Sequence, residues 1–102
     1  MTMLHTVNKS PFERRTLDSC FSHAEPGSAV LMIEDAVYGG IKGTAVADKV
    51  KAAMDHFKIY VLGPDVRARG LDESQVIDGI NVVDYAGFVD LVAEHAKVQA
   101  WL

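Results

Sequence analysis

The run Ser28-Ala29-Val30-Leu31-Met32-Ile33 is almost entirely apolar, and it constrains the fold more than any other segment. A strand with one face in water carries apolar residues at every second position, whereas a continuous apolar run indicates a strand covered on both faces. Such strands belong to parallel sheets, because the crossover connections of those sheets place helices on the faces. We therefore expect residues 28–33 to form a central strand.

Strand-like and helix-like segments alternate along the rest of the chain. Further β-favouring runs predict strands at residues 3–7, 58–62 and 80–83. Apolar residues at helical spacing predict three helices: one from Pro11 to a stop at Pro26-Gly27, one from near Thr44 to Phe57, and one after Asp84. This order predicts an α/β fold, a three-layer sandwich with a small, mainly parallel sheet of four or five strands, flavodoxin-like in architecture.

Local signals mark where several of these elements begin and end. Ser10-Pro11-Phe12-Glu13 has the form of a capping box with proline at the first helical position, and Asp84 can cap the last helix. Gly70 can end a short helical turn at 65–69 in the left-handed conformation. The first helix is expected to bury one side, formed by Phe12, Leu17, Cys20, Phe21 and Ala24.

Size and composition limit the classes of function. A chain of 102 residues fits one domain, residues 1–102, and an apolar fraction of 49% suggests surface left over for a subunit interface. The net charge of -4, with Lys and Arg scattered, disfavours direct binding to nucleic acid. The longest apolar run, 29–33, is far shorter than the roughly 20 residues of a membrane span. One cysteine and no signal-peptide pattern at residues 1–5 favour a cytoplasmic location.

Cys20 is the only side chain with an obvious route to covalent chemistry. The thiolate is the reactive form, and helix N-termini, neighbouring cations or metals favour it. Cys20 has little of this help, because it lies near the C-terminal end of its expected helix and Arg14 and Arg15 point to the opposite face. Only His23, one turn onward, could activate it. On the pattern alone, we favour a buried cysteine that fills the apolar stripe beside Leu17 and Phe21.

Other polar groups are weaker candidates. Parallel sheets bind ligands at the carboxyl ends of their strands, where Glu34-Asp35 could serve acid–base chemistry, although capping by Asp35 is the favoured role. Residues 39–44, Gly-Gly-Ile-Lys-Gly-Thr, match neither a Walker A loop nor a dinucleotide fingerprint. We therefore favour a chain-turning loop there over a nucleotide site.

No cofactor and no metal is expected. The four histidines are scattered, and Cys20-x-x-His23 could supply at most half of a zinc site. His5 and His95 are interpreted as satisfied structural residues. Trp101 needs either a groove of its own domain or the surface of a partner, and we favour the partner.

Several motifs occur together in a fixed order along the chain. They are Met3-Leu4-His5-Thr6-Val7-Asn8-Lys9-Ser10-Pro11, Glu34-Asp35-Ala36-Val37-Tyr38, Lys58-Ile59-Tyr60-Val61-Leu62, Asp65-Val66-Arg67-Ala68-Arg69-Gly70-Leu71, and Val83-Asp84-Tyr85 leading through Gly87-Phe88-Val89 to Trp101. This set resembles the DsrH/TusB family over nearly the whole chain.

The resemblance implies a DsrEFH-like fold and a small cytoplasmic subunit of a heterohexamer. Its partners would be DsrE-like and DsrF-like chains, or TusD and TusC, with two copies of each subunit. Such complexes pass persulfide sulfur between cysteines toward a DsrC-like or TusE-like acceptor. The principal sulfur-carrying cysteine is on the DsrE or TusD subunit, so this chain alone is expected to have little activity.

The family has two branches that Cys20 helps to separate. DsrH-like members carry a cysteine in the first helix, and TusB-like members generally lack it, so Cys20 implies a DsrH-like subunit in dissimilatory sulfur oxidation. In this interpretation Cys20 is a candidate persulfide carrier. The alternatives are a TusB-like subunit of the TusBCD relay for tRNA 2-thiouridine synthesis, and a non-catalytic assembly subunit of either complex. Glu34 stands where many relatives have glutamine, and no role follows for it.

Overall fold

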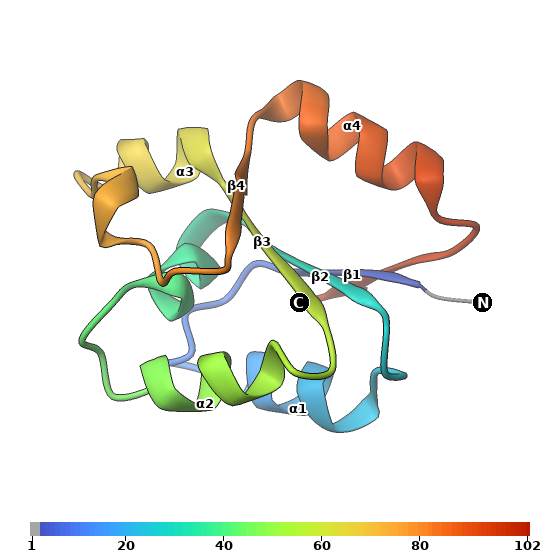
Figure 1. Ribbon diagram of the computed structural model, residues 1–102, viewed down its shortest axis with the longest axis horizontal. Helices are drawn as coiled ribbons and strands as arrows, with labels where there is room; N and C mark the ends of the chain where they lie inside the picture. Colours follow the sequence, from blue (N-terminus) through green and yellow to red (C-terminus); the bar gives the residue numbers. More distant parts are fainter. Residues whose placement is uncertain (1–2) are drawn as a thin grey trace.

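A computed structural model describes residues 3–102, which form one five-stranded sheet with helices on both faces (Figure 1). Every strand pairing is parallel, and the strand order is β4-β3-β2-β1-β5. The strands are β1 (Leu4–Val7), β2 (Ala29–Met32), β3 (Lys58–Leu62), β4 (Asn81–Val83) and β5 (Val98–Trp101). The helices are α1 (Thr16–His23), α2 (Ala47–Ala53), α3 (Gly63–Ala68) and α4 (Tyr85–Glu94), with 3-10 helices η1 (Glu34–Gly40) and η2 (Glu73–Gln75).

The predicted α/β architecture is confirmed, and β2 takes the central position that its apolar run predicts. All four residues of β2 are buried, because helices cover both of its faces. Gly70 has the predicted left-handed backbone, with φ of 72°. Asp84 caps α4 as expected, since its Oδ1 accepts a hydrogen bond from the Gly87 amide at 2.8 Å.

The two faces of the sheet are covered unequally. The chain steps in one direction from β1 to β4 and then returns to place β5 beside β1, so right-handed crossovers put α4 on the face opposite α1 and α2 (Figure 1). The face under α1 and α2 carries the larger core, which includes Val7, Val30 and Val61. The face under α4 carries a small cluster of Leu4, Ala29, Leu31 and Leu91.

The first helix starts later than predicted. Ser10 does begin a turn, in which its Oγ accepts from the Phe12 amide at 3.2 Å and its carbonyl accepts from Arg14 at 3.0 Å. That turn does not continue into α1, which begins at Thr16. Phe12 therefore falls outside the helical repeat and is 53% exposed, so the expectation that it packs on the buried side was wrong.

The last strand was absent from the sequence prediction. Val98–Trp101 pairs with β1 along the edge of the sheet, with Leu4 opposite Val98 and Val7 opposite Trp101. Its residues are mostly exposed, so the sequence lacks the apolar run that marked β2. The third helix also starts at Gly63, two residues before the predicted turn, with Pro64 in its first turn.

None of the helices among the described residues is long and apolar enough to cross a bilayer.

Candidate functional site

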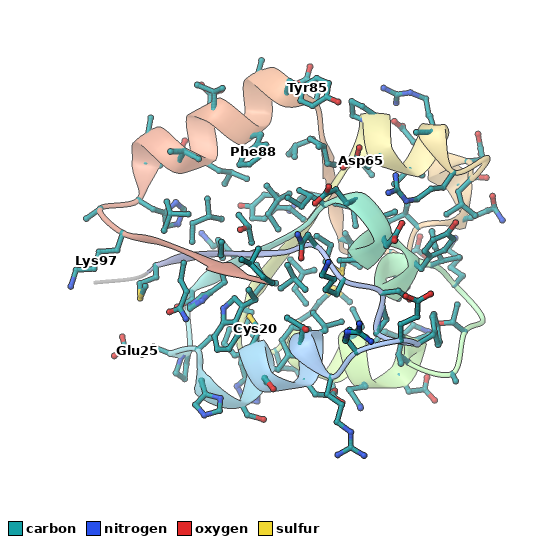
Figure 2. All side chains as sticks on the ribbon, turned by 180° about the vertical axis from the view of Figure 1, so that it is seen from behind. Cys20, Glu25, Asp65, Tyr85, Phe88 and Lys97 are labelled. Carbon is teal, nitrogen blue, oxygen red and sulfur yellow. The ribbon has the colours of Figure 1, made fainter. Side chains whose placement is uncertain are left out.

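Cys20 lies on the side of α1 that faces the sheet (Figure 2). Its side chain is fully buried in the core, as are Leu17, one turn earlier, and Val30 of β2. The predicted apolar stripe is therefore present from Leu17 onward, and Phe21 and Ala24 pack against the same core. In the folded chain, Cys20 occupies the position of a packing residue.

Burial also changes the acidity of Cys20. Loss of hydration raises the pKa of the thiol to about 12. A pKa of about 12 leaves about one thiolate in 10⁵ molecules at pH 7. His23 does not counteract this, because it is exposed and its Nδ1 donates a hydrogen bond to the Ser19 carbonyl at 2.8 Å. Sulfur chemistry at Cys20 therefore requires α1 to move away from the sheet.

Polar contacts join the segments that follow the carboxyl ends of the neighbouring strands β2 and β3. Glu34 follows the central strand with φ of 49°, a left-handed conformation that is uncommon outside glycine, and its amide donates to Asp65 Oδ2 at 2.7 Å. Asp35 binds Arg69, with both guanidinium contacts at 2.9 Å. Capping by Asp35 was thus a wrong expectation, because Asp65 satisfies the start of η1 from 31 residues away.

The glycine-rich segment serves packing. A Cβ on Gly40 would lie 2.8 Å from Val61 Cγ1, and one on Gly39 would lie 3.2 Å from Leu17 Cδ2. These glycines let η1 pack closely over the sheet, and Gly43, with φ of 77°, turns the chain toward α2. The structure therefore favours the chain-turning interpretation over a phosphate loop.

A shallow groove of about 490 Å³ lies at the carboxyl ends of β3 and β4, between the starts of α3 and α4. Its charged residues already have partners: Arg67 binds Glu73 at 3.0 Å, and Asp84 caps α4. The groove has no nucleophilic side chain among its lining residues, which are Gly63, Pro64, Arg67, Glu73, Val82, Val83, Asp84 and Gly87.

A second pocket, of about 470 Å³, lies between the end of α1 and β5, and we call it the Trp101 pocket after one of its lining residues. The Trp101 indole N–H donates to His5 Nδ1 at 3.0 Å, which places the proton of neutral His5 on Nε2. His5 is 3% exposed, its Nε2 has no partner among the described residues, and burial lowers its pKa. Lys97 and Glu25 lie at this end of the molecule (Figure 2).

The contact between Trp101 and His5 could not be predicted, because the two residues are 96 positions apart. Trp101 is half-buried against its own chain, so it already uses the first of the two environments that the sequence suggested. His95 is satisfied as predicted, with Nδ1 donating to the Leu91 carbonyl at 2.7 Å. Across residues 3–102, no three His, Cys, Asp or Glu side chains lie close enough together to hold a metal ion.

The chain resembles known proteins over nearly its whole length. Residues 9–98 match the family model described as DsrH like protein. The chain is 33% identical to Protein TusB of Pectobacterium parmentieri and 34% identical to Protein TusB of Photorhabdus laumondii, each over 99 residues. Protein TusB of Escherichia coli K12 is 30% identical over 99 residues. Each alignment covers 97% of this chain and all of the relative.

Solved structures share the fold at low sequence identity. A protein of unknown function from Methanobacterium thermoautotrophicum, MTH1491, superposes with a TM-score of 0.74 at 14% identity, covering 96% of this chain and 97% of its own. The ychN protein of E. coli superposes with a TM-score of 0.73 at 15% identity, covering 98% and 99%. Both solved structures therefore share the complete fold of this chain.

Proposed function

Because the chain belongs to the DsrH-like protein family, we propose that it is a TusB-like subunit of a sulfur-relay complex and acts in assembly rather than as a catalyst. The observation that carries this proposal is the similarity to proteins named TusB, which covers 97% of this chain and all of each relative. Within the proposal, sulfur passes over partner subunits toward thiolation of uridine in tRNA. A TusB-like role was the alternative that the sequence left open, and the relatives support it better than a role in sulfur oxidation.

The position of Cys20 supports an assembly role. A carrier must expose a thiolate to its donor and acceptor, whereas Cys20 is fully buried with its pKa raised to about 12. Cys20 is the only cysteine of the chain, and it lines neither the groove at the carboxyl ends of β3 and β4 nor the Trp101 pocket. The persulfide would therefore reside on a cysteine of a partner subunit. Cys20 as a carrier stays a prediction that needs an opened α1.

The partners belong to the same proposal. We expect DsrE-like and DsrF-like chains, or their TusD-like and TusC-like counterparts, in a cytoplasmic heterohexamer with two copies of each subunit. The acceptor of the sulfur would be a TusE-like or DsrC-like protein.

A DsrEFH-type role in sulfur oxidation is the second candidate. It is favoured by one feature, a cysteine in the first helix at the position that the DsrH-like branch carries. The two candidates differ in the final acceptor of the sulfur, so cellular products separate them.

Deletion of the gene in its own organism tests the proposal. We expect 2-thiouridine, measured in total tRNA by mass spectrometry of nucleosides, to fall strongly and to return with the wild-type gene. Cys20→Ala and Cys20→Ser should also restore it, provided that native mass spectrometry shows the variant in the complex. Unchanged 2-thiouridine with loss of sulfur oxidation would contradict the proposal and favour the DsrEFH role.

A second assay separates the carrier from the assembly role. The purified complex is treated with inorganic polysulfide, from which a cysteine thiolate takes one sulfane sulfur as the shortened polysulfide leaves, and the mass of each intact subunit is measured. We expect the added sulfur on a partner subunit. A gain of one sulfur atom on this chain, absent in Cys20→Ser, would contradict the assembly role.

A further inference from the structure

The Trp101 pocket contains a buried hydrogen-bond donor that has no acceptor. His5 lines this pocket and is 3% exposed. Its Nδ1 accepts the indole N–H of Trp101 at 3.0 Å, so the proton of the neutral ring is on Nε2, which has no partner within residues 3–102. A buried donor without an acceptor destabilises the fold. A group that brings an acceptor oxygen to His5 would therefore be stabilising.

The strand β5 forms one edge of the sheet beside this pocket. The Lys97 carbonyl accepts from the Leu4 amide at 3.0 Å, so the backbone groups of residues 97, 99 and 101 face β1 in the parallel ladder. The N–H and C=O groups of the alternate residues, Val98 and Ala100, therefore point away from the sheet, and both residues are exposed. This edge offers a row of free backbone donors and acceptors.

Nothing in β5 protects this edge from pairing with another strand. Edge strands are commonly blunted by proline, by charged residues or by a bulge. The residues of β5, Val-Gln-Ala-Trp, include neither a charge nor a proline, and they pair with β1 in continuous register. The opposite edge is formed by β4, which has only three residues. An added strand therefore finds its backbone partners most readily at β5.

A second copy of β5 supplies a matching strand. In an antiparallel pair, two residues exchange both hydrogen bonds only if the backbone groups of both point across the gap. A two-fold axis at Gln99 meets this condition, because it places Val98 opposite the partner's Ala100 and Ala100 opposite the partner's Val98. The edge is thus complementary to itself.

The same axis aligns complementary side chains beside the pocket. Lys97, Gln99 and Trp101 line the pocket, so their side chains share one face of β5. Lys97 comes opposite the partner's Trp101, where its ammonium group can contact the face of the indole. Lys97 is free for this contact, since it forms no ion pair within residues 3–102. On the other face, Val98, which is 45% exposed, comes opposite the partner's Ala100.

The axis also places an acceptor in line with His5. His5 stands directly opposite Gln99 in the register of β1 and β5, and the axis places the partner's Gln99 directly opposite Gln99. The partner's strand then lies about 10 Å from β1, two strand spacings away, which the side chains of His5 and the partner's Gln99 can span together. Gln99 of the same chain is exposed and makes no hydrogen bond to His5 Nε2.

We propose that two copies of this chain pair through β5 in antiparallel orientation about a two-fold axis at Gln99, and that the side-chain oxygen of the partner's Gln99 accepts from His5 Nε2–H. Pairing over four residues buries little surface, so we expect a dissociation constant of about 10–100 μM. The inference goes beyond the proposed function and does not depend on it, because every contact is between copies of this chain.

Disulfide trapping tests the position of the axis. Gln99→Cys in a Cys20→Ala background brings two thiols into a pair without backbone hydrogen bonds, with Cα atoms about 4.5 Å apart, which suits a disulfide. In a glutathione buffer this variant should form a linked dimer at least about tenfold faster than Ala52→Cys, at an exposed position of α2 in the same background. Equal rates would overturn the proposal. Faster trapping at Ala100→Cys would move the axis and overturn the role of Gln99.

Substitutions at the edge test the contacts. Ala100→Pro removes an outward N–H that β1 does not use and should weaken the dimer at least about tenfold, whereas Ala100→Ser keeps the N–H and should bind like wild type. Gln99→Leu keeps a long side chain without an acceptor and should weaken the dimer about three- to tenfold. Sedimentation equilibrium gives the dissociation constants, and circular dichroism checks that each variant is folded. Fluorescence of Trp101, the only tryptophan, should change over the same range of wild-type concentration.

The outcomes separate this inference from the proposed function. A wild-type chain that stays monomeric at millimolar concentration, or a dimer that Ala100→Pro leaves unchanged, would overturn the inference alone. A dimer that Gln99→Leu leaves unchanged would overturn the assignment of an acceptor to His5. The proposed function is decided separately, by 2-thiouridine in tRNA.

Discussion

At the scale of single residues, burial decides what the polar and reactive groups can do. Cys20 and His5 are both almost completely buried, and in both cases loss of hydration favours the neutral form. A sequence shows the presence of a thiol or an imidazole, but its reactivity depends on which face of the element it occupies. For Cys20 the apolar stripe of the helix predicted the buried face. For His5 no such prediction was possible, because all four residues of β1 are buried and no alternation distinguishes its two faces.

Alkylation of the isolated chain should be slow at Cys20. Because the pKa of Cys20 is raised to about 12, the folded chain should react with iodoacetamide at pH 8 at least about 10³-fold more slowly than the urea-unfolded chain. Equal rates would show that α1 opens readily, which favours the carrier role.

Cys20→Ser should lower the free energy of unfolding by about 1–3 kcal/mol, since it buries a hydroxyl in an apolar site. Ser22→Ala, at an exposed position of α1, is the control.

His5 should make stability depend on pH. Burial lowers its pKa, so below its ordinary value of 6.5 the unfolded chain binds a proton that the folded chain does not. The contribution of neutral His5 to the free energy of unfolding is fully present above pH 6.5. It is lost as the pH falls from 6.5 through the lowered pKa of His5 in the folded chain. Urea unfolding at pH 7.5 and at pH 5.0 measures the difference, which His5→Asn should reduce. An equal pH dependence in this variant would contradict the prediction.

At the scale of elements, close approach and capping fix the structure around the sheet. Apolar periodicity and punctuation by Gly and Pro were sufficient to predict β2, β3 and α4, because those signals are local. The cap of η1 by Asp65 and the strand β5 depend on partners far along the chain, so local patterns could not reveal them. For the same reason the Trp101 pocket was invisible, although each of its residues could be read in the sequence.

The packing of η1 predicts a costly substitution at Gly40. Gly40→Ala would place a methyl group 2.8 Å from Val61 Cγ1, which should lower the free energy of unfolding by about 1–3 kcal/mol. Val61→Ala removes the obstructing methyl groups, so the double variant should lose less than the sum of the two single losses. Chemical denaturation of the three variants measures this coupling. Strict additivity would contradict the proposed clash.

At the scale of the whole molecule, the sheet is strongest at its centre and weakest at its edges. β2 is buried on both faces, whereas β4 has three residues and β5 is mostly exposed. We expect hydrogen exchange in the isolated chain to be slowest at β2 amides and fastest at β4 and β5. Faster exchange at β2 amides than at β5 amides would contradict this prediction.

The pairing of β5 with β1 has a consequence for the kinetics of folding. Leu4 and Val98 are 94 positions apart, so joining these strands closes a loop of almost the whole chain. Such contacts carry a high entropic cost and form late, after the local β1-to-β4 steps have built most of the sheet. Trp101 is the only tryptophan and reaches His5 through this pairing. Its fluorescence should therefore change later during refolding than the far-UV circular dichroism of the helices. Trp101 is thus an intrinsic probe of the step that completes the sheet.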